Sequence, residues 1–531
     1  MPDRDDSGLG CKIYLELPVP SEDDERPADE RIREGIRQAG ITGSVRMPLA
    51  FLQKLYPLCD EAEWKVTVSL SWNGEAWDAV NLESGDTSGR QYALAVDLGS
   101  TAVVARLIDL ATGEMLGQES TYNAQIRFGE DILQRIFYAH EGPAWLKTMQ
   151  TAALMSIREV CTLLQKRFDI AQEDCLCMTV AGNACMIHFL LGLDAFCVFH
   201  SPYAMRTLDP GFIPAGDLGL PLHGNVYIFP ALANYVGGDI ISGLLATGLY
   251  RSKEVSLFFD VGTNGELVVG NRDFLLCGAG AAGPALEGGV VKTGMRASEG
   301  AVEEVQLKNG EFCVSTVEDA APRGICGSGI IDLLAELFLN GWVDIKGKLQ
   351  TEKSRLIALR HNDDSDEDEY AVEYASGLWF YQSDIDEFIR TKAAAVTMME
   401  YMLQETGFST EDIRTFYMAG AFGAHVNKES AVTIGMYPDV PREKIVPCGN
   451  TSLEGASRLL RDRSLLNDIP QMLSLMTYVQ YGAIDNFLTL MEAAAALPHT
   501  DQTRYPSVMK KREGKAGSGY PAVRQSSIER T

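Results

Sequence analysis

Two short segments of the chain share a pattern although they lie far apart in the sequence. The first is Leu94-Ala-Val-Asp-Leu-Gly-Ser-Thr101 and the second is Leu257-Phe-Phe-Asp-Val-Gly-Thr-Asn264. Each is an apolar strand that ends in Asp-x-Gly followed by Ser or Thr, and each continues into a second strand. The pattern therefore predicts two β-hairpins that open two related α/β lobes.

Both turns have the residue types that suit an anion with a bound cation. A strand that ends in Asp and turns through Gly presents backbone N–H groups to an anion, and the carboxylates of Asp97 and Asp260 can hold a hydrated Mg²⁺. For either turn alone an ordinary hairpin is the simpler interpretation, because Asp and Gly are common turn residues. Their matched context favours a nucleotide polyphosphate held from both sides.

Two further glycine-rich stretches lead into helices. Gly324-Ile-Cys-Gly-Ser-Gly329 precedes an apolar helix whose N-terminus suits phosphate, and a tight loop with an ordinary cap at Ser328 is an equal alternative. Met418-Ala-Gly-Ala-Phe-Gly423 follows a strand and can pass beneath a purine and ribose, with Phe422 as an apolar wall. Packing is the commoner reason for two glycines in such a turn.

Small residues also mark the starts of two helices, at 235–243 and 449–456. Such residues let two helices approach closely and slide, which suits a hinge between lobes. Tight packing without motion is the alternative.

The composition limits the partners of the chain. Its 531 residues contain 46 basic and 73 acidic side chains, for a formal charge of −27, which repels nucleic acid and disfavours the DNA- and RNA-binding classes. No apolar run is long enough to cross a bilayer, and the N-terminus Met1-Pro-Asp-Arg-Asp-Asp is not a signal peptide. We therefore expect a cytoplasmic protein that binds small ligands and other proteins, with no nucleic acid and no membrane.

The cysteines do not follow the spacing of a redox centre. There are 11 of them, and the densest group is Cys175, Cys177 and Cys185, which matches neither the plant-type nor the bacterial iron–sulfur pattern. We expect these side chains to be small apolar residues of the core.

Changes in composition predict four parts. Residues 1–28 are expected to be an extended linker, and residues 29–88 a small α/β middle domain with a hairpin at Lys65–Trp72. The two lobes would occupy residues 89–495. The basic, Pro/Gly/Ser-rich residues 496–531 would be disordered.

With these segments assembled, the chain resembles the superfamily of actin, sugar kinases and Hsp70 ATPases, which have two phosphate loops, two connecting helices and an adenosine loop. More closely it resembles the ATP-dependent reductive activators of corrinoid proteins, over nearly the whole ordered chain. The segments that carry this closer resemblance are Lys12-Ile-Tyr-Leu-Glu-Leu-Pro18, Gly182-Asn-Ala-Cys-Met-Ile-His-Phe-Leu-Leu-Gly192, Gly324-Ile-Cys-Gly-Ser-Gly329 and Gly449-Asn-Thr-Ser452. The fold implied is a duplicated two-lobe actin-like ATPase preceded by the small α/β domain.

The resemblance implies a repair reaction of anaerobic metabolism. The chain would hydrolyse ATP and return the corrinoid protein of a methyltransferase system from inactive Co(II) to Co(I). Family members commonly carry an iron–sulfur domain that supplies the electron. Here no cysteine follows Cys448, so we expect no iron–sulfur cluster in this chain. Either a separate ferredoxin-like protein donates the electron, which is our prediction, or the chain keeps only the ATPase part of the role. The oligomeric state is left open, a homodimer included.

The resemblance also implies roles for the motif residues. Asp97 and Asp260 would hold Mg²⁺ through water and orient the attacking water, and they are the predicted catalytic and metal-binding residues. The residues predicted to contact ATP belong to the four loops: Gly99, Ser100, Thr101, Gly262, Thr263, Asn264, Gly324, Gly327, Ser328 and Gly329 at the phosphates, and Gly420, Phe422 and Gly423 at the adenosine.

Three other functions fit parts of the same pattern. A small-molecule kinase on the same fold would use Asp239 as its general base, but no polar sugar-binding cluster is recognisable. An activator of a radical acyl-CoA dehydratase would hold an iron–sulfur cluster between two subunits through closely placed cysteines. A nucleotide-dependent scaffold would bind ATP without turning it over.

Overall fold

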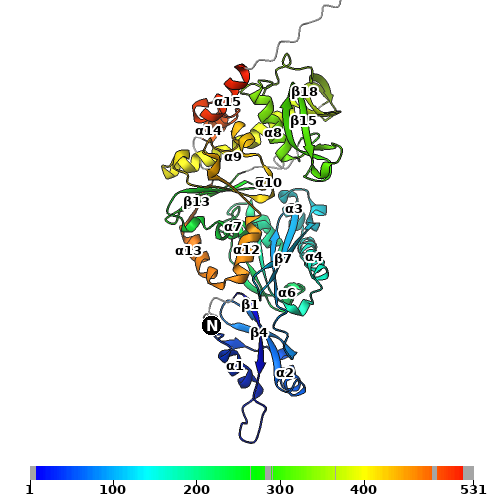
Figure 1. The fold of residues 1–531 in the computed structure, drawn as a ribbon, viewed down its shortest axis with the longest axis vertical. Coiled ribbons are helices and arrows are strands. Elements are labelled where there is room, and N and C mark those ends of the chain that lie inside the picture. Colours follow the sequence, from blue (N-terminus) through cyan, green and yellow to red (C-terminus); the bar gives the residue numbers. More distant parts are fainter. Residues whose placement is uncertain are drawn as a thin grey trace, which may run out of the picture. The chain divides into compact units, whose positions relative to one another are not determined.

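A computed structural model describes residues 8–262, 265–280, 289, 291–364, 366–480 and 487–517 of the chain. The chain divides into two compact units, which are described separately (Figure 1). Unit 1 contains three segments of the chain: Met1–Lys253, Gly270–Cys277 and Asn450–Val479. Unit 2 contains the other three segments: Glu254–Val269, Gly278–Gly449 and Gln480–Thr531.

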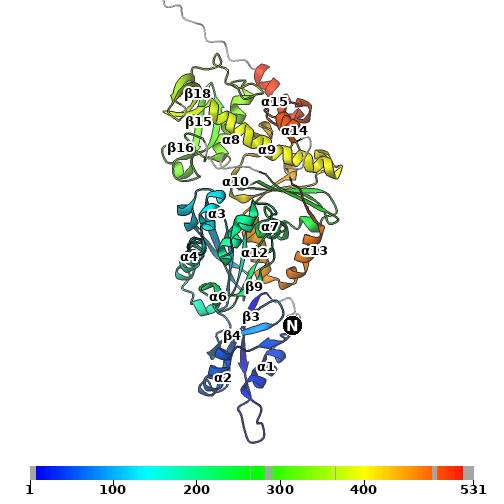
Figure 2. The same cartoon turned by 180° about the vertical axis from the view of Figure 1, so that it is seen from behind.

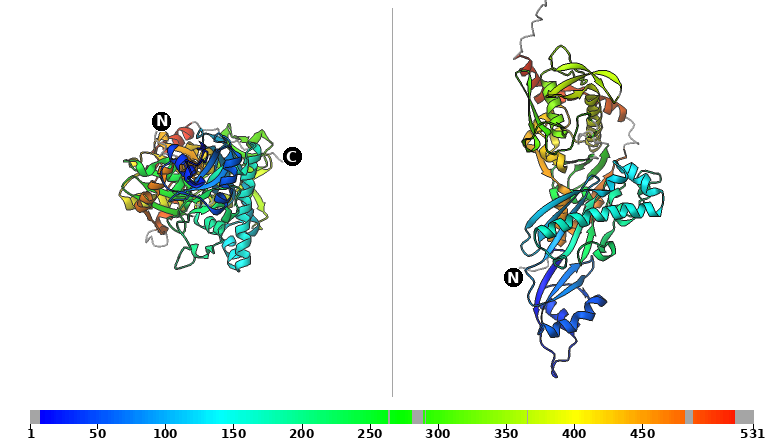
Figure 3. Two further views of the ribbon diagram at one scale, coloured as in Figure 1. Left: turned by 90° about the horizontal axis from the view of Figure 1, so that it is seen from below. Right: turned by 90° about the vertical axis from the view of Figure 1, so that its right-hand side faces the viewer.

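The N-terminal part of unit 1 is a four-stranded sheet with two helices on one face (Figure 3, right). Its strands lie in the order β1-β3-β4-β2. The bounds of these elements are β1(Gly10–Glu16), α1(Ala28–Gln38), β2(Val45–Arg46), α2(Leu49–Glu61), β3(Lys65–Trp72) and β4(Trp77–Ser84). The predicted hairpin is present, with β3 as its first strand. Apolar side chains of both helices and of the sheet form one core.

The prediction of a linker over residues 1–28 is wrong for residues 10–16. These residues form β1, which pairs antiparallel with β3 along its whole length. The strand is also tied to the rest of unit 1, because the buried Lys12 ammonium forms ion pairs with Asp174 (2.5 Å) and Glu83 (2.6 Å). The prolines that suggested a linker come only after the strand ends, so composition hid a strand that long-range pairing creates.

The larger sheet of unit 1 has six strands in the order β7-β6-β5-β8-β10-β9. The strands are β5(Tyr92–Leu98), β6(Ala102–Asp109), β7(Met115–Tyr122), β8(Cys175–Gly182), β9(Gly211–Pro214) and β10(Asn225–Ile228). Strand β5 is antiparallel to β6 and parallel to β8. Helix α4(Pro143–Arg167) packs on this sheet, and α3(Ile132–His140) and α5(Ala184–Leu191) pack on α4. Helices α3 and α4 lie next to each other (Figure 2).

Two helices of unit 1 approach each other closely, as their small residues predict. They are α7(Gly238–Thr247) and α12(Thr451–Arg461). A Cβ at Gly455 would lie 1.9 Å from the carbonyl oxygen of Ser242, and the Ser242 hydroxyl donates to the carbonyl of Ser452 (2.6 Å). Glycine is therefore required at position 455 for the two backbones to pack.

Unit 2 contains a sheet with the strand order β21-β20-β11-β12. These strands are β11(Ser256–Val261), β12(Gly265–Gly270), β20(Phe416–Ala419) and β21(Ile445–Gly449). Two three-stranded sheets accompany it, β15-β14-β16 and β17-β18-β19. Their strands are β14(Ala301–Lys308), β15(Glu311–Thr316), β16(Gly324–Ile325), β17(Ile357–Asn362), β18(Glu367–Ala375) and β19(Leu378–Tyr381). The helices are α8(Gly327–Leu339), α9(Gln382–Thr406), α10(Gly420–His425), α11(Lys428–Thr433), α14(Phe487–Ala494) and α15(Pro506–Gly517).

The two large sheets repeat one arrangement around the Asp-x-Gly turns. In each, the strand that carries the aspartate has a parallel partner, and the aspartate lies opposite an alanine: Asp97 opposite Ala181 and Asp260 opposite Ala419. A glycine follows each alanine and approaches the carbonyl of the residue after the aspartate. The predicted α/β class and the two related hairpins are therefore present.

The prediction of disorder from residue 496 onward is wrong for the described residues up to 517. His499 and Tyr505 are buried, and α15 continues the ordered chain. The Lys392 ammonium on α9 donates to the carbonyls of Ala494, Ala496 and Pro498 at 2.6, 2.6 and 2.8 Å. These three hydrogen bonds and the buried side chains stabilise an ordered segment, although its composition is typical of disorder.

Within the part of the chain that the structure describes, every helix is either too short or too polar to cross a membrane.

Candidate functional site

The first turn, residues 97–101, places a carboxylate at the end of a central strand. Asp97 on β5 is half-buried, and its two oxygens accept hydrogen bonds from the Asn450 side chain (Oδ2, 2.7 Å) and the Ser452 hydroxyl (Oδ1, 2.9 Å). Burial raises the pKa of Asp97, and the two hydrogen bonds oppose that rise. Each oxygen keeps a second lone pair, so the carboxylate can still accept hydrogen bonds from water.

A second carboxylate lies beside Asp97 in unit 1. Asp239 is in the first turn of α7, and one of its oxygens accepts from the N–H of Ile240 (2.9 Å). Burial, together with the negative charge of Asp97, raises the pKa of Asp239 to about 7. The sequence pattern placed Asp239 only in the kinase alternative, although a Gly-Gly-Asp helix start is a recognisable signal.

Four polar side chains that hold the first turn were missed as site residues. Asn450 and Ser452 lie in a segment that was interpreted only as a helix start, and Asn123 and Arg135 had no assigned role. The signal for Arg135 is its place on the apolar face of a helix, between Ile132 and Ile136, where a charged side chain needs a buried partner. Nothing in the local sequence indicates the partner itself.

The second turn, residues 260–264, is described up to Gly262. Thr263 and Asn264 lie outside the described residues. Asp260 is the second-to-last residue of β11, and Gly420 lies against it. A Cβ at Gly420 would be 2.8 Å from Asp260 Oδ1 and 2.5 Å from the Val261 carbonyl oxygen. The structure therefore brings together two predicted site residues that are far apart in the sequence.

The predicted adenosine loop begins at that contact. Gly420 has a φ of 84°, which favours glycine, and it starts the short helix α10 directly after β20. Gly423 packs on Met418. The side chain of Phe422 lies outside the described residues, so its role as an apolar wall stays a prediction.

The loop at Gly324 precedes α8, as predicted, but its cap differs. The helix begins at Gly327, and the residue that caps it is Cys326 rather than Ser328. The first helical hydrogen bond runs from the N–H of Ile330 to the carbonyl of Cys326 (3.0 Å). The N–H groups of residues 327–329 precede that bond and are the ones that a helix start offers to an anion. Helix α8 also contacts α10.

Two glycines of this loop also serve packing. A Cβ at Gly329 would lie 2.3 Å from the Val302 carbonyl oxygen, and a Cβ at Gly324 would lie 2.6 Å from the Thr293 carbonyl oxygen. These close approaches support the packing interpretation of the two glycines. The start of the helix is largely buried, with Gly327 and Gly329 buried and Ser328 partly exposed, and the phosphate interpretation stays a prediction.

The three cysteines of the densest group are buried, as expected. Cys175, Cys177 and Cys185 lie in β8 and α5, and burial raises the pKa of each thiol, to about 11 for Cys175. Among the described residues, no group of three or more His, Cys, Asp or Glu side chains is placed to hold a metal ion. A hydrated Mg²⁺ needs no such group, because one or two carboxylates and the phosphates of a substrate suffice.

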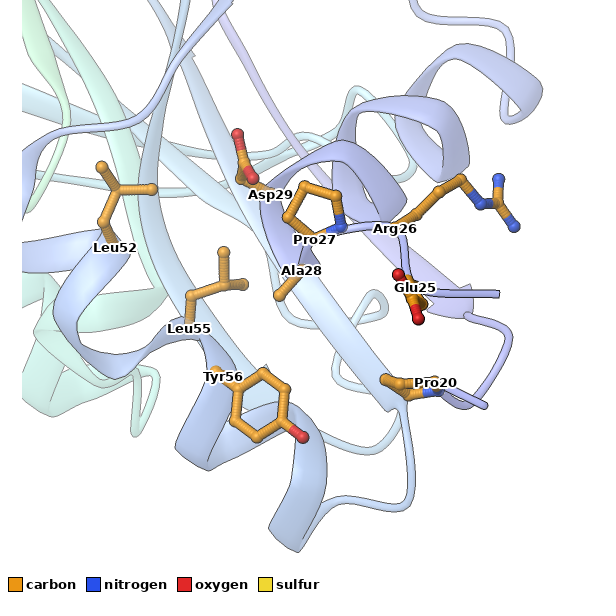
Figure 4. Close-up of a pocket in the computed structure, with 9 residues that line it drawn as sticks. All are labelled: Pro20, Glu25, Arg26, Pro27, Ala28, Asp29, Leu52, Leu55 and Tyr56. Atoms are coloured by element: carbon orange, nitrogen blue, oxygen red, sulfur yellow. The ribbon is translucent and has the colours of Figure 1, made fainter. Parts of the chain in front are cut away.

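A separate cavity of about 420 Å³ lies in the N-terminal part of unit 1 (Figure 4). The start of α1 and one side of α2 form its walls, and Leu52, Leu55 and Tyr56 lie opposite Pro27 and Ala28. None of the predicted site residues lines it.

Three family models match consecutive parts of the chain. The RACo linker region matches residues 11–89, the RACo middle region matches residues 92–252, and the C-terminal domain of RACo, described as the ASKHA domain, matches residues 254–509. These boundaries differ from those predicted. The small N-terminal domain is the family's linker region, and the predicted 89–495 lobes divide into the middle region and the ASKHA domain.

Three individual proteins are also similar to this chain. A solved structure called the reductive activator for corrinoid,iron-sulfur protein is 36% identical with a TM-score of 0.86, over 94% of this chain and 81% of that one. The corrinoid activation enzyme RamQ of Eubacterium limosum is 33% identical over 72% of this chain and 66% of its own length. The [Co(II) methylated amine-specific corrinoid protein] reductase of Methanosarcina barkeri is 25% identical over 73% of each chain. The chain thus spans about two thirds of RamQ.

Proposed function

Because the chain belongs to the RACo family of reductive activators of corrinoid proteins, we propose that it uses ATP to drive the reduction of a corrinoid protein from Co(II) to Co(I). The observation that carries this proposal is the first turn. It places a half-buried carboxylate with two remaining acceptor positions at the end of strand β5, in a chain whose relatives are named for corrinoid activation.

ATP would bind in a duplicated, actin-like ATPase fold made of the two hairpin-containing lobes. Asp97 and Asp260 would hold Mg²⁺ through water, and the ion would neutralise charge on the phosphate oxygens. Asp97 fits this role, since both of its oxygens keep a free lone pair beside the hydrogen bonds from Asn450 and Ser452. The same two hydrogen bonds favour the ionised carboxylate, which a cation needs.

The remaining predicted residues would orient the nucleotide. The N–H groups and side chains of Gly99, Ser100, Thr101, Gly262, Thr263 and Asn264 would contact phosphates, and the start of α8 at Gly327, Ser328 and Gly329 would add N–H donors. Gly420 to Gly423 would seat the adenosine. Catalysis by position and charge stabilisation needs no covalent nucleophile.

ATP would serve to change conformation rather than to transfer phosphate. An electron donor of ordinary potential cannot reduce Co(II) unaided, because each ~59 mV of unfavourable one-electron potential costs about a factor of ten in equilibrium. Binding and hydrolysis of ATP would shift the chain between two states, and the partner-binding state would alter the cobalt ligation. We propose a separate ferredoxin-like protein as the electron donor.

The partner would be the corrinoid protein of a methyltransferase system in the cytoplasm. Methylated-amine-specific corrinoid proteins are the first ones to try, because that is the substrate named for one of the relatives.

The test is an anaerobic reduction assay. The chain, Mg²⁺ and ATP are mixed with a low-potential reductant and a methylated-amine-specific corrinoid protein, and the Co(II) absorption band is followed. We expect the band to disappear only with ATP, and we expect Asp97→Asn and Asp260→Asn to slow its loss about 100-fold or more. The matched control is Asp217→Asn, an exposed aspartate of unit 1, which should behave as the unchanged chain. Reduction that proceeds equally without ATP contradicts the proposal.

A further inference from the structure

We infer that Asn123 and Arg135 are positioning residues for the ATP phosphates, because they fix two peptide groups of the first turn so that the N–H groups of Ser100 and Thr101 face the nucleotide. This role rests on the proposed nucleotide site. It concerns two residues outside the Asp-x-Gly pattern, in the loop after β7 and in α3.

Three consecutive carbonyls of the first turn are held by these residues. The Asn123 side-chain amide donates to the carbonyl of Gly99 (2.8 Å). The Arg135 guanidinium donates through Nη1 to the carbonyl of Ser100 (2.5 Å), and the backbone N–H of Asn123 donates to the carbonyl of Thr101 (2.9 Å). The carbonyl side of the turn therefore faces the loop after β7 and helix α3.

The geometry of the peptide bond carries this arrangement to the other side of the turn. The cis peptide bonds of the described residues precede Pro202 and Pro498, so both peptide groups within residues 99–101 are trans. In a trans peptide the C=O and the following N–H point in opposite directions. A donor on the carbonyl of Gly99 thus directs the N–H of Ser100 away from Asn123, and a donor on the carbonyl of Ser100 directs the N–H of Thr101 away from Arg135.

Asn123 is held in place independently of the turn. Its side chain is 1% exposed, and its Oδ1 accepts from the N–H of Gln125 (3.0 Å) as a cap of the following 3₁₀ helix. The backbone N–H of Ala124, the residue that follows Asn123, donates to the Ser156 hydroxyl on α4 (2.9 Å). The amide group therefore has one orientation, with its NH₂ toward Gly99.

Arg135 is fixed in a similar way. Its side chain is 1% exposed, and besides Ser100 it donates to the carbonyls of Gly129 (2.8 Å) and Glu130 (3.3 Å). The planar guanidinium forms all three bonds from one rigid fork. Gly129 allows this approach, since a Cβ there would lie 2.7 Å from the Cβ of Gln134.

Without these donors a peptide of the turn can rotate and present a carbonyl oxygen to the nucleotide. A carbonyl beside a phosphate oxygen is repulsive, whereas an N–H is a donor. The loss should therefore appear in the binding of phosphates and not in the binding of the adenosine.

Binding of ATP with Mg²⁺, and of adenosine, to the full chain tests this role by calorimetry. The sharpest variant is Asn123→Asp, which keeps the cap on Gln125 but replaces the donor to Gly99 with an oxygen. Arg135→Met removes all three donors, and Arg135→Lys restores one ammonium donor in case Arg135→Met does not fold. We expect Asn123→Asp and Arg135→Met to weaken ATP binding about tenfold, which is ~1.4 kcal/mol, with adenosine binding unchanged and Arg135→Lys intermediate.

Two buried residues elsewhere in unit 1, one in α1 and one in β10, provide matched controls. Arg31 is also 1% exposed and donates to three backbone carbonyls, and Asn225 is a buried asparagine whose side-chain NH₂ donates to Asp78 (3.0 Å). Arg31→Met and Asn225→Asp should lower the melting temperature and leave ATP affinity as it was.

The outcomes are distinguishable. Variants that bind ATP like the unchanged chain overturn the role, and so does an equal loss of ATP binding in the controls or an equal loss of adenosine binding. An unchanged chain that binds no ATP overturns both this role and the proposed function. An unchanged chain that binds ATP but reduces no corrinoid protein contradicts the proposed function alone, because the positioning role is measured by binding.

Discussion

The first turn and the second turn have the same pattern and the same place in their sheets, yet the glycine that packs against each turn fits it differently. At the first turn, Gly182 approaches the Leu98 carbonyl without a positive φ. At the second, Gly420 has a φ of 84° and approaches the Asp260 carboxylate as well as a backbone carbonyl, with no room for a Cβ. A repeated strand–turn pattern thus fixes the backbone of a site, whereas its support can differ from one copy to the other.

The strongest test of this difference is Gly420→Ala. The residue has a φ of 84°, and its new Cβ would meet Val261 and the Asp260 carboxylate. We expect the free energy of unfolding to decrease by about 2–4 kcal/mol. We also expect ATP-dependent activity to fall about 100-fold, because a displacement of the Asp260 carboxylate misplaces the reacting groups. Thermal unfolding and the anaerobic assay measure the two effects.

Two glycines provide controls for that variant. Gly407 has a φ of 71° and no neighbouring atom within 4 Å of an added Cβ, so Gly407→Ala should cost only the backbone strain, about 1 kcal/mol, with activity retained. Gly182 is the structural counterpart of Gly420, and its added Cβ would lie 2.8 Å from the Leu98 carbonyl. Because it lacks a positive φ, Gly182→Ala should have the smaller effect; an equal loss of activity in all three variants would refute the distinction.

A smaller effect is expected from Ser452→Ala in the first turn. The change removes one hydrogen-bond donor from the Asp97 carboxylate. A hydrogen bond of this kind contributes about 1 kcal/mol, so we expect kcat/KM for ATP hydrolysis to fall about fivefold. That hydrogen bond lowers the pKa of Asp97, so its loss raises the pKa, and the acidic limb of the pH–rate profile should move to higher pH. Ser474→Ala, an exposed serine of the same unit, is the control. A fall in rate at every pH with no shift of the limb would mean that Ser452 acts on structure alone.

The smallest effect concerns the second carboxylate at the first turn. The pKa of Asp239 is raised from its ordinary 3.8 to about 7. Between these values the folded chain holds a proton that the unfolded chain has released, so the free energy of unfolding decreases as the pH rises through this window. Without nucleotide and with EDTA, the melting temperature should fall between pH 5 and pH 8, and Asp239→Asn should make that fall shallower. Asp217→Asn should not change the slope, and equal slopes in all three proteins would show that Asp239 does not titrate in this range.

Much of the site was predictable because it depends on local patterns. Asp97 and Asp260 follow apolar strands and precede glycines, and that order alone predicts a hairpin with a carboxylate at the strand end. The glycines at 324–329 and 420–423 likewise precede helices in the sequence and in the structure. Each of these features involves residues that are neighbours along the chain.

The errors share one cause, which is contact at long sequence separation. Strand β1 was missed because its residues pair with residues of β3 that lie 49 to 61 positions further along the chain. The C-terminal segment was missed because the Lys392 ammonium that binds its carbonyls comes from α9. Composition and periodicity describe what a segment prefers, and they do not show what it will pack against.

The sequence alone determined the backbone of this protein's site: two strand ends, two carboxylates and the glycines that let loops turn tightly. Only the tertiary structure decided which side chains hold that backbone, since Asn123, Arg135, Asn450 and Ser452 reach the first turn from three other segments. The physical reason is that a strand or a turn is stabilised by hydrogen bonds between near neighbours. The orientation of a peptide group or carboxylate within it depends on donors that folding brings from elsewhere.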